Sequence, residues 1–192
     1  MLNSGRAAGP SRSRNAPRQT PRSHPHPVQV FAKIRPMHIR ALHPSDYALL
    51  SPVLDEWWGG RPVGGLLPRL FFEHFGSTSC VLEEDGAIKG FLVGFVSQSM
   101  PTIAYIHLVG VSPDKRKQGY GGLLYERFFD LAAVHGCSEV HCITTPINAG
   151  PIAFHTQLGL EIVDTGDSVD GIPVKLDYAG PGQHRVLFRK QL

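Results

Sequence analysis

The stretch Val109-Gly-Val-Ser-Pro-Asp-Lys-Arg-Lys-Gln-Gly-Tyr-Gly-Gly122 decides the fold of this chain. The first three residues of this stretch end the segment 102–111, whose composition is typical of a β-strand. Pro113 then indicates a turn, and the glycines lead into an amphipathic helix that we expect over 120–135. The sequence therefore predicts a strand, a turn, a glycine-rich loop and a helix in that order.

Such a helix start is suited to binding an anion. The first amides of a helix have no intrahelical partner and lie at the positive end of its dipole. Gly119, Gly121 and Gly122 carry no Cβ, so a phosphate can approach the backbone closely, and three basic residues, 115–117, precede them. The alternative is a plain connection whose glycines only give flexibility. The stretch is neither a P-loop, because no Gly-Lys-Ser/Thr follows, nor a G-x-G-x-x-G dinucleotide site.

The rest of the chain predicts alternating short strands and helices. Ser45 and Asp46 are typical of a helix start, Gly159 of a helix end, and Glu84-Asp-Gly86 of a hairpin turn. We expect strands at 38–42, 78–84, 88–97, 102–111, 139–144, 160–164 and 185–190, and helices at 44–56, 67–75, 120–135 and 149–158.

Residues 1–36 differ in composition from the remainder. They hold seven basic residues, six prolines and no acidic residue, so their formal charge is +7. Because the net charge of the whole chain is +3, residues 37–192 carry −4. We predict a disordered basic extension over 1–36 and one folded domain over 37–192. Three interpretations of the extension stay open: a dispensable segment upstream of a start at Met37, a transit peptide, which the prolines disfavour, or a nucleic-acid-binding arm.

Two motifs resemble those of the GNAT superfamily of N-acetyltransferases. Arg116-Lys-Gln-Gly-Tyr-Gly121 matches the pyrophosphate signature R/Q-x-x-G-x-G/A, and Ala153-Phe-His-Thr-Gln-Leu-Gly-Leu160 resembles the helix end A-x-x-F-Y-x-x-L-G-F. The resemblance covers roughly residues 37–192. It implies an α/β (α+β) fold with a mixed, mostly antiparallel twisted sheet of about six to seven strands, flanked by about four helices. It also implies that the fourth and fifth strands splay apart.

The resemblance implies acetyl-CoA as cofactor, with coenzyme A as product and no metal, because the thioester is already activated. The main chain of Val109, Gly110 and Val111 is expected to bind the pantetheine arm, and Asn148 and Phe154 to contact the cofactor. The pyrophosphate is expected at the signature residues Arg116, Lys117, Gln118, Gly119, Tyr120, Gly121 and Gly122.

Attack of an amine on a thioester calls for a base and for a proton donor to the thiolate. The expected base, acting directly or through a water, is His107, which lies two residues before Val109 and so shares its face of a regular strand. The alternative is a half-buried His that packs on the sheet and bonds a backbone carbonyl. Relatives carry catalytic side chains at the positions of Tyr105 and His107. His155 stands where many relatives have a Tyr that acts as the general acid. The proton donor could therefore be His155, Tyr105 or solvent.

The acceptor wall is expected between the first two helices, at Trp57, Trp58 and Arg61. A loop Trp can stack on the acceptor, and Arg61 can clamp a carboxylate, although one Trp is expected to fill the core instead. Asp177 and Tyr178, on the long segment before the last strand, are further candidates for closing over the acceptor.

The sequence thus predicts an N-acetyltransferase that modifies a primary amine of a small or amino-acid-like acceptor by direct attack. The alternatives are a catalytically silent acyl-CoA-binding module and a protein-lysine or N-terminal acetyltransferase. No apolar run approaches the roughly 20 residues of a membrane helix, and the three cysteines, at 80, 137 and 142, lack CxxC spacing. We expect a cytoplasmic protein, capable of forming a homodimer, and we do not expect membrane or nucleic-acid binding.

Overall fold

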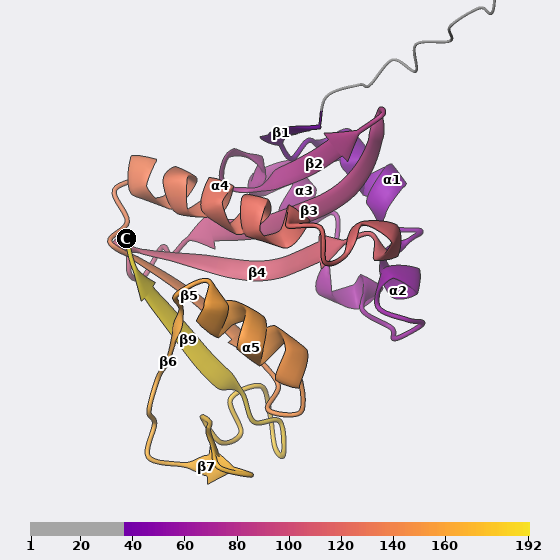
Figure 1. The fold of residues 1–192 in the computed structure, drawn as a ribbon. Helices are drawn as coiled ribbons and strands as arrows, with labels where there is room; N and C mark the ends of the chain where they lie inside the picture. Colours follow the sequence, from indigo (N-terminus) through magenta and orange to yellow (C-terminus); the bar gives the residue numbers. More distant parts are fainter. Residues whose placement is uncertain (1–36) are drawn as a thin grey trace, which may run out of the picture. The chain divides into compact units, whose positions relative to one another are not determined.

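A seven-stranded sheet in the order β1-β2-β3-β4-β5-β9-β6 forms the centre of the computed structural model, which describes residues 37–192 (Figure 1). All its strand pairs are antiparallel except β4 with β5, which confirms the predicted fold class. The expectations for residues 1–36 lie outside the described part. The strands are β1 His38–Ala41, β2 Cys80–Glu84, β3 Ala87–Val96, β4 Ile103–Val111, β5 Glu139–Thr144, β6 Glu161–Ile162 and β9 Val186–Gln191.

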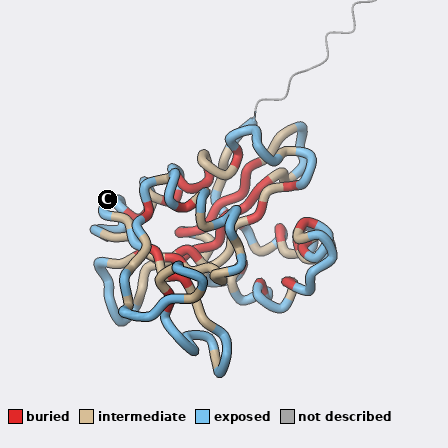
Figure 2. The backbone as a smooth tube through the Cα atoms, turned by 60° about the horizontal axis from the view of Figure 1, so that its bottom comes forward, coloured by how far each residue is buried: buried red, intermediate tan, exposed pale blue. Residues whose placement is uncertain are grey.

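Helices cover both faces of this sheet, and each face has its own hydrophobic cluster. On one face, α4 (Tyr120–Val134) and α5 (Ala149–Gln157) pack over a cluster that includes Leu124, Phe128 and Phe188. On the other, α1 (Tyr47–Leu50), α2 (Leu54–Trp57) and α3 (Leu70–His74) pack over a cluster around Phe72 and Phe91. The buried residues follow the central strands, and the exposed ones lie on the outer loops and helix faces (Figure 2).

The two expected helices before β2 are shorter than the sequence predicts. The first, expected over 44–56, is divided into a 3₁₀ turn at Pro44–Asp46, α1 and α2, because Pro52 has no amide to continue the helical ladder. The second, expected over 67–75, is limited to α3 by Pro68, and Gly64–Leu66 forms a separate 3₁₀ turn. This segment is therefore a string of short turns rather than two regular helices.

A β-bulge at His107 corrects the prediction that His107 and Val109 share a face. Val93 pairs with Leu108 but Gly94 pairs with Ile106, so His107 is an extra residue in β4. Val109 packs in the cluster under α4, whereas His107 stacks on Phe71 at the opposite face. The prediction that His107 and Val109 share a face was wrong because a bulge reverses the alternation at one residue.

The pairing of β4 with β5 stops partway along β4, so the sheet opens there. Only three residue pairs join the strands, from Ile103 with Glu139 to Tyr105 with His141. Beyond Tyr105, β4 runs on to Val111 without pairing to β5, and the two half-sheets diverge as a V (Figure 1). The backbone of the second half of β4 is thus free on its β5 side, as the resemblance implied.

The segment before the last strand holds a small hairpin that the sequence analysis missed. Strands β7 (Ser168–Val169) and β8 (Ile172–Pro173) pair around Asp170 and Gly171, which both have positive φ angles of 51° and 78°. An Asp-Gly pair with two positive φ angles is a signal of a tight hairpin turn. No helix in the described part of the chain has the length and apolar content to cross a membrane.

Candidate active site

The start of α4 leaves backbone donors available for a ligand. Gly119 precedes the helix with φ +85°, a left-handed conformation that a residue with a Cβ rarely adopts, and no side chain of the described part of the chain caps the helix. The first backbone bond runs from the Leu123 amide to the Gly119 carbonyl at 3.2 Å. Within residues 37–192 the amides of 120–122 have no backbone acceptor, so they are free to hold an anion.

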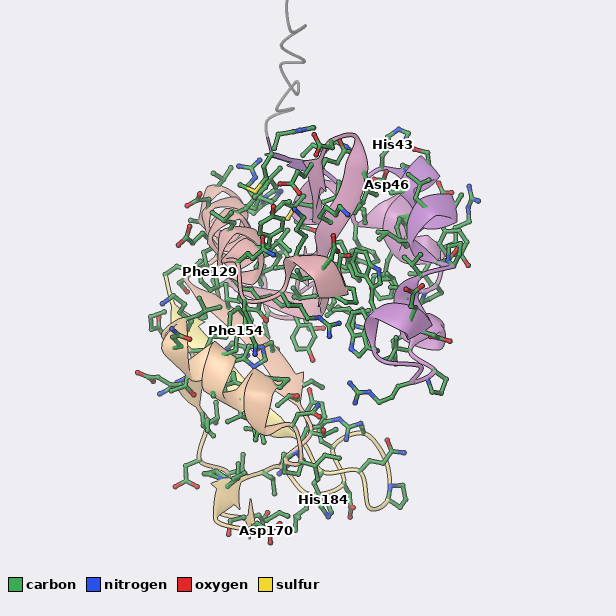
Figure 3. All side chains as sticks on the ribbon, turned by 45° about the vertical axis from the view of Figure 1, so that its right-hand side comes forward. His43, Asp46, Phe129, Phe154, Asp170 and His184 are labelled. Atoms are coloured by element: carbon green, nitrogen blue, oxygen red, sulfur yellow. The ribbon has the colours of Figure 1, made fainter. Side chains whose placement is uncertain are left out.

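A cavity of about 730 Å³ lies beside these amides, within the size range of ligand pockets. Phe154 projects into the space between α4 and α5, where it forms part of the wall (Figure 3). Nine of the twelve predicted cofactor residues line the cavity: Val109, Val111, Arg116, Lys117, Gly119, Tyr120, Gly121, Gly122 and Phe154. Lys115, Tyr125, Pro151, Gln157 and Leu158 complete the wall.

Three predicted cofactor residues, Gly110, Gln118 and Asn148, do not line this cavity. Gly110 lies under two aromatic rings, and a Cβ there would come within 2.7 Å of Trp58 and 2.5 Å of Phe91. The side-chain amide of Gln118 donates to the Asp114 carbonyl at 2.9 Å, and the side-chain amide of Asn148 donates to the Thr144 hydroxyl at 3.2 Å. Gly110 therefore serves the packing of the Trp58 segment, and the other two side chains serve local turns.

The basic residues around the helix start differ in their partners. Lys115 forms an ion pair with Glu84, which also accepts a hydrogen bond from the Tyr120 hydroxyl at 2.9 Å. Arg116 donates to the carbonyls of Val111, at 3.3 Å, and of Trp57. Neither Arg116 nor Lys117 has a carboxylate partner among the residues that the structure describes. Their charge remains available to a phosphate.

His107 is half-buried and held in one orientation. Its Nε2 lies 2.6 Å from the Leu66 carbonyl, and its ring stacks on Phe71 with centroids 4.3 Å apart. A carbonyl accepts only, so Nε2 carries the hydrogen, and Nδ1 is the nitrogen that can take a proton. The bulge in β4 turns this side chain toward the α1–α3 face, at the point where the sheet opens.

The environment of His155 does not support the role of acid. The residue is 8% exposed, and burial lowers its pKa to about 4, so the ring is neutral at pH 7 and holds no surplus proton. Its Nε2 lies 2.8 Å from the hydroxyl of Tyr125, a cavity-lining residue that the sequence analysis did not single out. Tyr105 is half-buried on the α1–α3 face and also stays neutral, because burial raises its pKa.

The expected acceptor residues divide between core and surface. Trp57 is 6% exposed and stacks on Phe91, so it is the Trp that fills the core. Trp58 is half-buried over Gly110, and Arg61 is exposed, with Nε 3.4 Å from the Trp58 carbonyl. Asp177 accepts from the Gly182 amide at 2.7 Å and so shapes its own loop. Across residues 37–192 no three His, Cys, Asp or Glu side chains cluster as metal ligands would.

An open seam in a mostly antiparallel sheet, next to an uncapped glycine-rich helix start, defines a class of acyltransferase. Residues 38–160 match the model of the acetyltransferase (GNAT) family. The chain belongs to this family, and it is an acetyltransferase. The L-2,4-diaminobutyric acid acetyltransferase of Nocardia farcinica is 28% identical over 138 residues, which are 72% of this chain and 72% of that protein.

Solved structures share the fold at low sequence identity. A GNAT-family protein from Desulfovibrio desulfuricans superposes with a TM-score of 0.68 and 15% identity, covering 81% of this chain and 99% of that one. The yncA protein of Salmonella typhimurium, solved with acetyl-CoA, has a TM-score of 0.61 and 20% identity over 82% of this chain and 94% of its own. At these identities the likeness establishes the fold alone.

Proposed function

We propose that the protein transfers the acetyl group of acetyl-CoA to a primary amine of a small, amino-acid-like acceptor. The observation that carries the proposal is the row of free amides at 120–122, at the mouth of a cavity that follows the unpaired edge of β4. These donors fit a pyrophosphate, and the free strand edge fits the amides of a pantetheine arm. Acetyl-CoA supplies an activated acyl group. The Salmonella structure contains acetyl-CoA, which supports this choice of cofactor.

The acceptor proposal rests on the face of the sheet opposite the cavity. His107, whose Nδ1 has no hydrogen-bond partner among the residues that the structure describes, takes the proton from the attacking amine directly or through water. Trp58 offers an aromatic surface, and Arg61 a guanidinium without a carboxylate partner among residues 37–192. The Nocardia relative is named for 2,4-diaminobutyric acid, a compound with two amines and a carboxylate, so we propose this class of acceptor.

An acceptor screen tests the proposal directly. Thiol release from acetyl-CoA is followed with 2,4-diaminobutyrate, other diamino acids, 1,3-diaminopropane and peptides with free N-termini or lysines. We expect the diamino acids to accelerate release most. Tight binding of coenzyme A without accelerated release by any amine would indicate a silent binding module, and preference for peptides would indicate a protein acetyltransferase.

Replacing His107 is expected to slow the chemical step. In His107→Ala the base is lost, so kcat is expected to fall on the order of 100-fold, and the acid limb of the pH–rate profile is expected to disappear. The matched control is His38→Ala on the far edge strand β1, which removes an imidazole paired with Glu83. An unchanged rate and pH profile in His107→Ala would remove His107 as the base.

Replacing Arg61 is expected to affect only acceptors with a carboxylate. In Arg61→Met the KM for 2,4-diaminobutyrate should rise about tenfold, because a charge-assisted hydrogen bond is lost. The KM for 1,3-diaminopropane, which has the same amines but no carboxylate, should not change. Equal effects on both acceptors would show that Arg61 does not read the carboxylate.

A further inference from the structure

Tyr125 and His155 form a buried pair to which the proposed reaction assigns no role. Tyr125, on α4, is 2% exposed, and its hydroxyl oxygen lies 2.8 Å from Nε2 of His155 on α5. The ring of Phe188 packs edge-on against His155 at 4.7 Å between centroids, and Phe154 packs edge-on against Tyr125 at 5.5 Å. Both partners are thus fixed by packing, and two helices that wall the cavity meet through one polar contact.

The unpaired nitrogen of His155 indicates the direction of this hydrogen bond. The ring is neutral, so it carries a single N–H, and its Nδ1 is buried without a partner among the described residues. A hydrogen on Nδ1 would be an orphaned buried donor, which folded proteins rarely contain. Nε2 therefore carries the hydrogen and donates to the Tyr125 oxygen. The hydrogen of the Tyr125 hydroxyl is then left free to point elsewhere.

The cavity is the place to which that hydrogen can point. Tyr125 lines it together with Val109, on the free edge of β4, and Phe154. The pyrophosphate-binding amides lie at the start of the same helix, and Tyr125 follows them by about one turn. Tyr125 therefore lines the cavity beyond the proposed phosphate-binding amides, where the acyl-carrying arm is expected.

We propose that Tyr125 donates a hydrogen bond to the sulfur of coenzyme A as the thioester bond breaks, and that His155 is the positioning residue that orients this hydroxyl. The inference deepens the proposed function and rests on it. It assigns the pair to the leaving group, in place of the acid role expected for His155.

The step balances without any further reactant. The amine nitrogen forms a bond to the acyl carbon, the C–S bond breaks, and its electron pair remains on sulfur. The Tyr125 hydroxyl stabilises that negative charge and keeps its own proton, in accord with the raised pKa that burial gives it. The proton that His107 or water removes from the amine reaches the thiolate through solvent.

The Tyr125→Phe variant tests the proposal. We expect kcat to fall about tenfold, because a hydrogen bond to a charged group is lost, while the Kd for coenzyme A stays within about twofold. The thiol of bound coenzyme A, titrated by its thiolate absorbance, should show a pKa about one unit higher than in the wild-type complex. Tyr47→Phe, which removes a hydroxyl beside Phe72 under the other face, is the matched control and should change neither quantity.

His155 is tested through its coupling to Tyr125 and through its tautomer. His155→Phe should lower kcat several-fold in the wild type and have no further effect in Tyr125→Phe. The ¹⁵N spectrum of the protein without ligand should show His155 protonated at Nε2 and not at Nδ1.

Two outcomes overturn the inference: a thiol pKa unchanged by Tyr125→Phe, or a hydrogen on Nδ1 of His155. Both readouts are independent of turnover. If no amine accelerates thiol release, the proposed function fails instead. If amines accelerate release equally in the wild type and in Tyr125→Phe, only the inference fails.

Discussion

Gly121→Val is expected to raise the Kd for acetyl-CoA on the order of 1,000-fold. A Cβ at this position would come within 2.9 Å of the Phe154 ring, on the opposite wall of the cavity. The two further methyl groups of Val would occupy the space in front of the free amides at 120–122. Overpacking and loss of the phosphate contact both weaken binding. The expected change in Kd corresponds to a loss of about 4 kcal/mol of binding free energy. Isothermal titration with coenzyme A measures it.

The control for this variant is Gly150→Val. Gly150 also lies in the first turn of a helix, α5, but a Cβ there would meet no atom of residues 37–192 within 4 Å. Its affinity for coenzyme A should match that of the wild type. The affinity of Gly121→Ala for coenzyme A, with one added methyl group, should lie between those of Gly121→Val and Gly150→Val. Wild-type affinity in Gly121→Val would contradict the assignment of this helix start as the pyrophosphate site.

His155 is expected to make the fold sensitive to mild acid. Burial lowers its pKa from 6.5 to about 4, so between these values the unfolded chain binds a proton that the folded chain does not. The free energy of unfolding therefore falls as pH falls, by about 3 kcal/mol between pH 7 and pH 4. Urea unfolding at several pH values measures this loss, and the His155→Phe variant should lack it.

The acid effect of His155 can be separated from that of other groups. His135→Gln, at an exposed imidazole near the end of α4, should keep the wild-type pH dependence. Burial opposes ionisation of Asp46, but hydrogen bonds from Arg40 and the His43 amide outweigh it and lower its pKa below 3.8. The stability that Asp46 contributes is therefore lost only at lower pH. Parallel pH curves for wild type and His155→Phe would contradict the buried neutral imidazole.

The parts of the fold that local chemistry determines could be predicted from the sequence. The start of α4 at Tyr120 follows from the glycines, and the bounds of β5 follow from its apolar alternation. The segment from Pro44 to Phe75 was predicted less well, because its apolar spacing continues across Pro52 and Pro68 while the helical ladder does not. Packing over Phe72 holds these short turns together, and a spacing pattern does not report that packing.

The candidate site is easier to predict from the sequence where backbone atoms would form it than where side chains meet across the fold. Gly119, Gly121 and Gly122 mark the proposed anion site, because a backbone without Cβ atoms lets a phosphate approach closely. The bulge at His107 has no such mark, since it depends on how β3 and β4 pair. Tyr125 is likewise one polar residue on a helix, and its contact with His155 joins positions 30 residues apart.

The three-pair junction between β4 and β5 has a mechanical consequence. The sheet consists of two half-sheets that are joined only where β4 and β5 begin. An extended amide chain lying along the free edge of β4 would supply hydrogen bonds that β5 does not. Such a ligand would act as an additional strand and join the two half-sheets along the opening. Binding of the ligand would then stiffen the sheet that binds it.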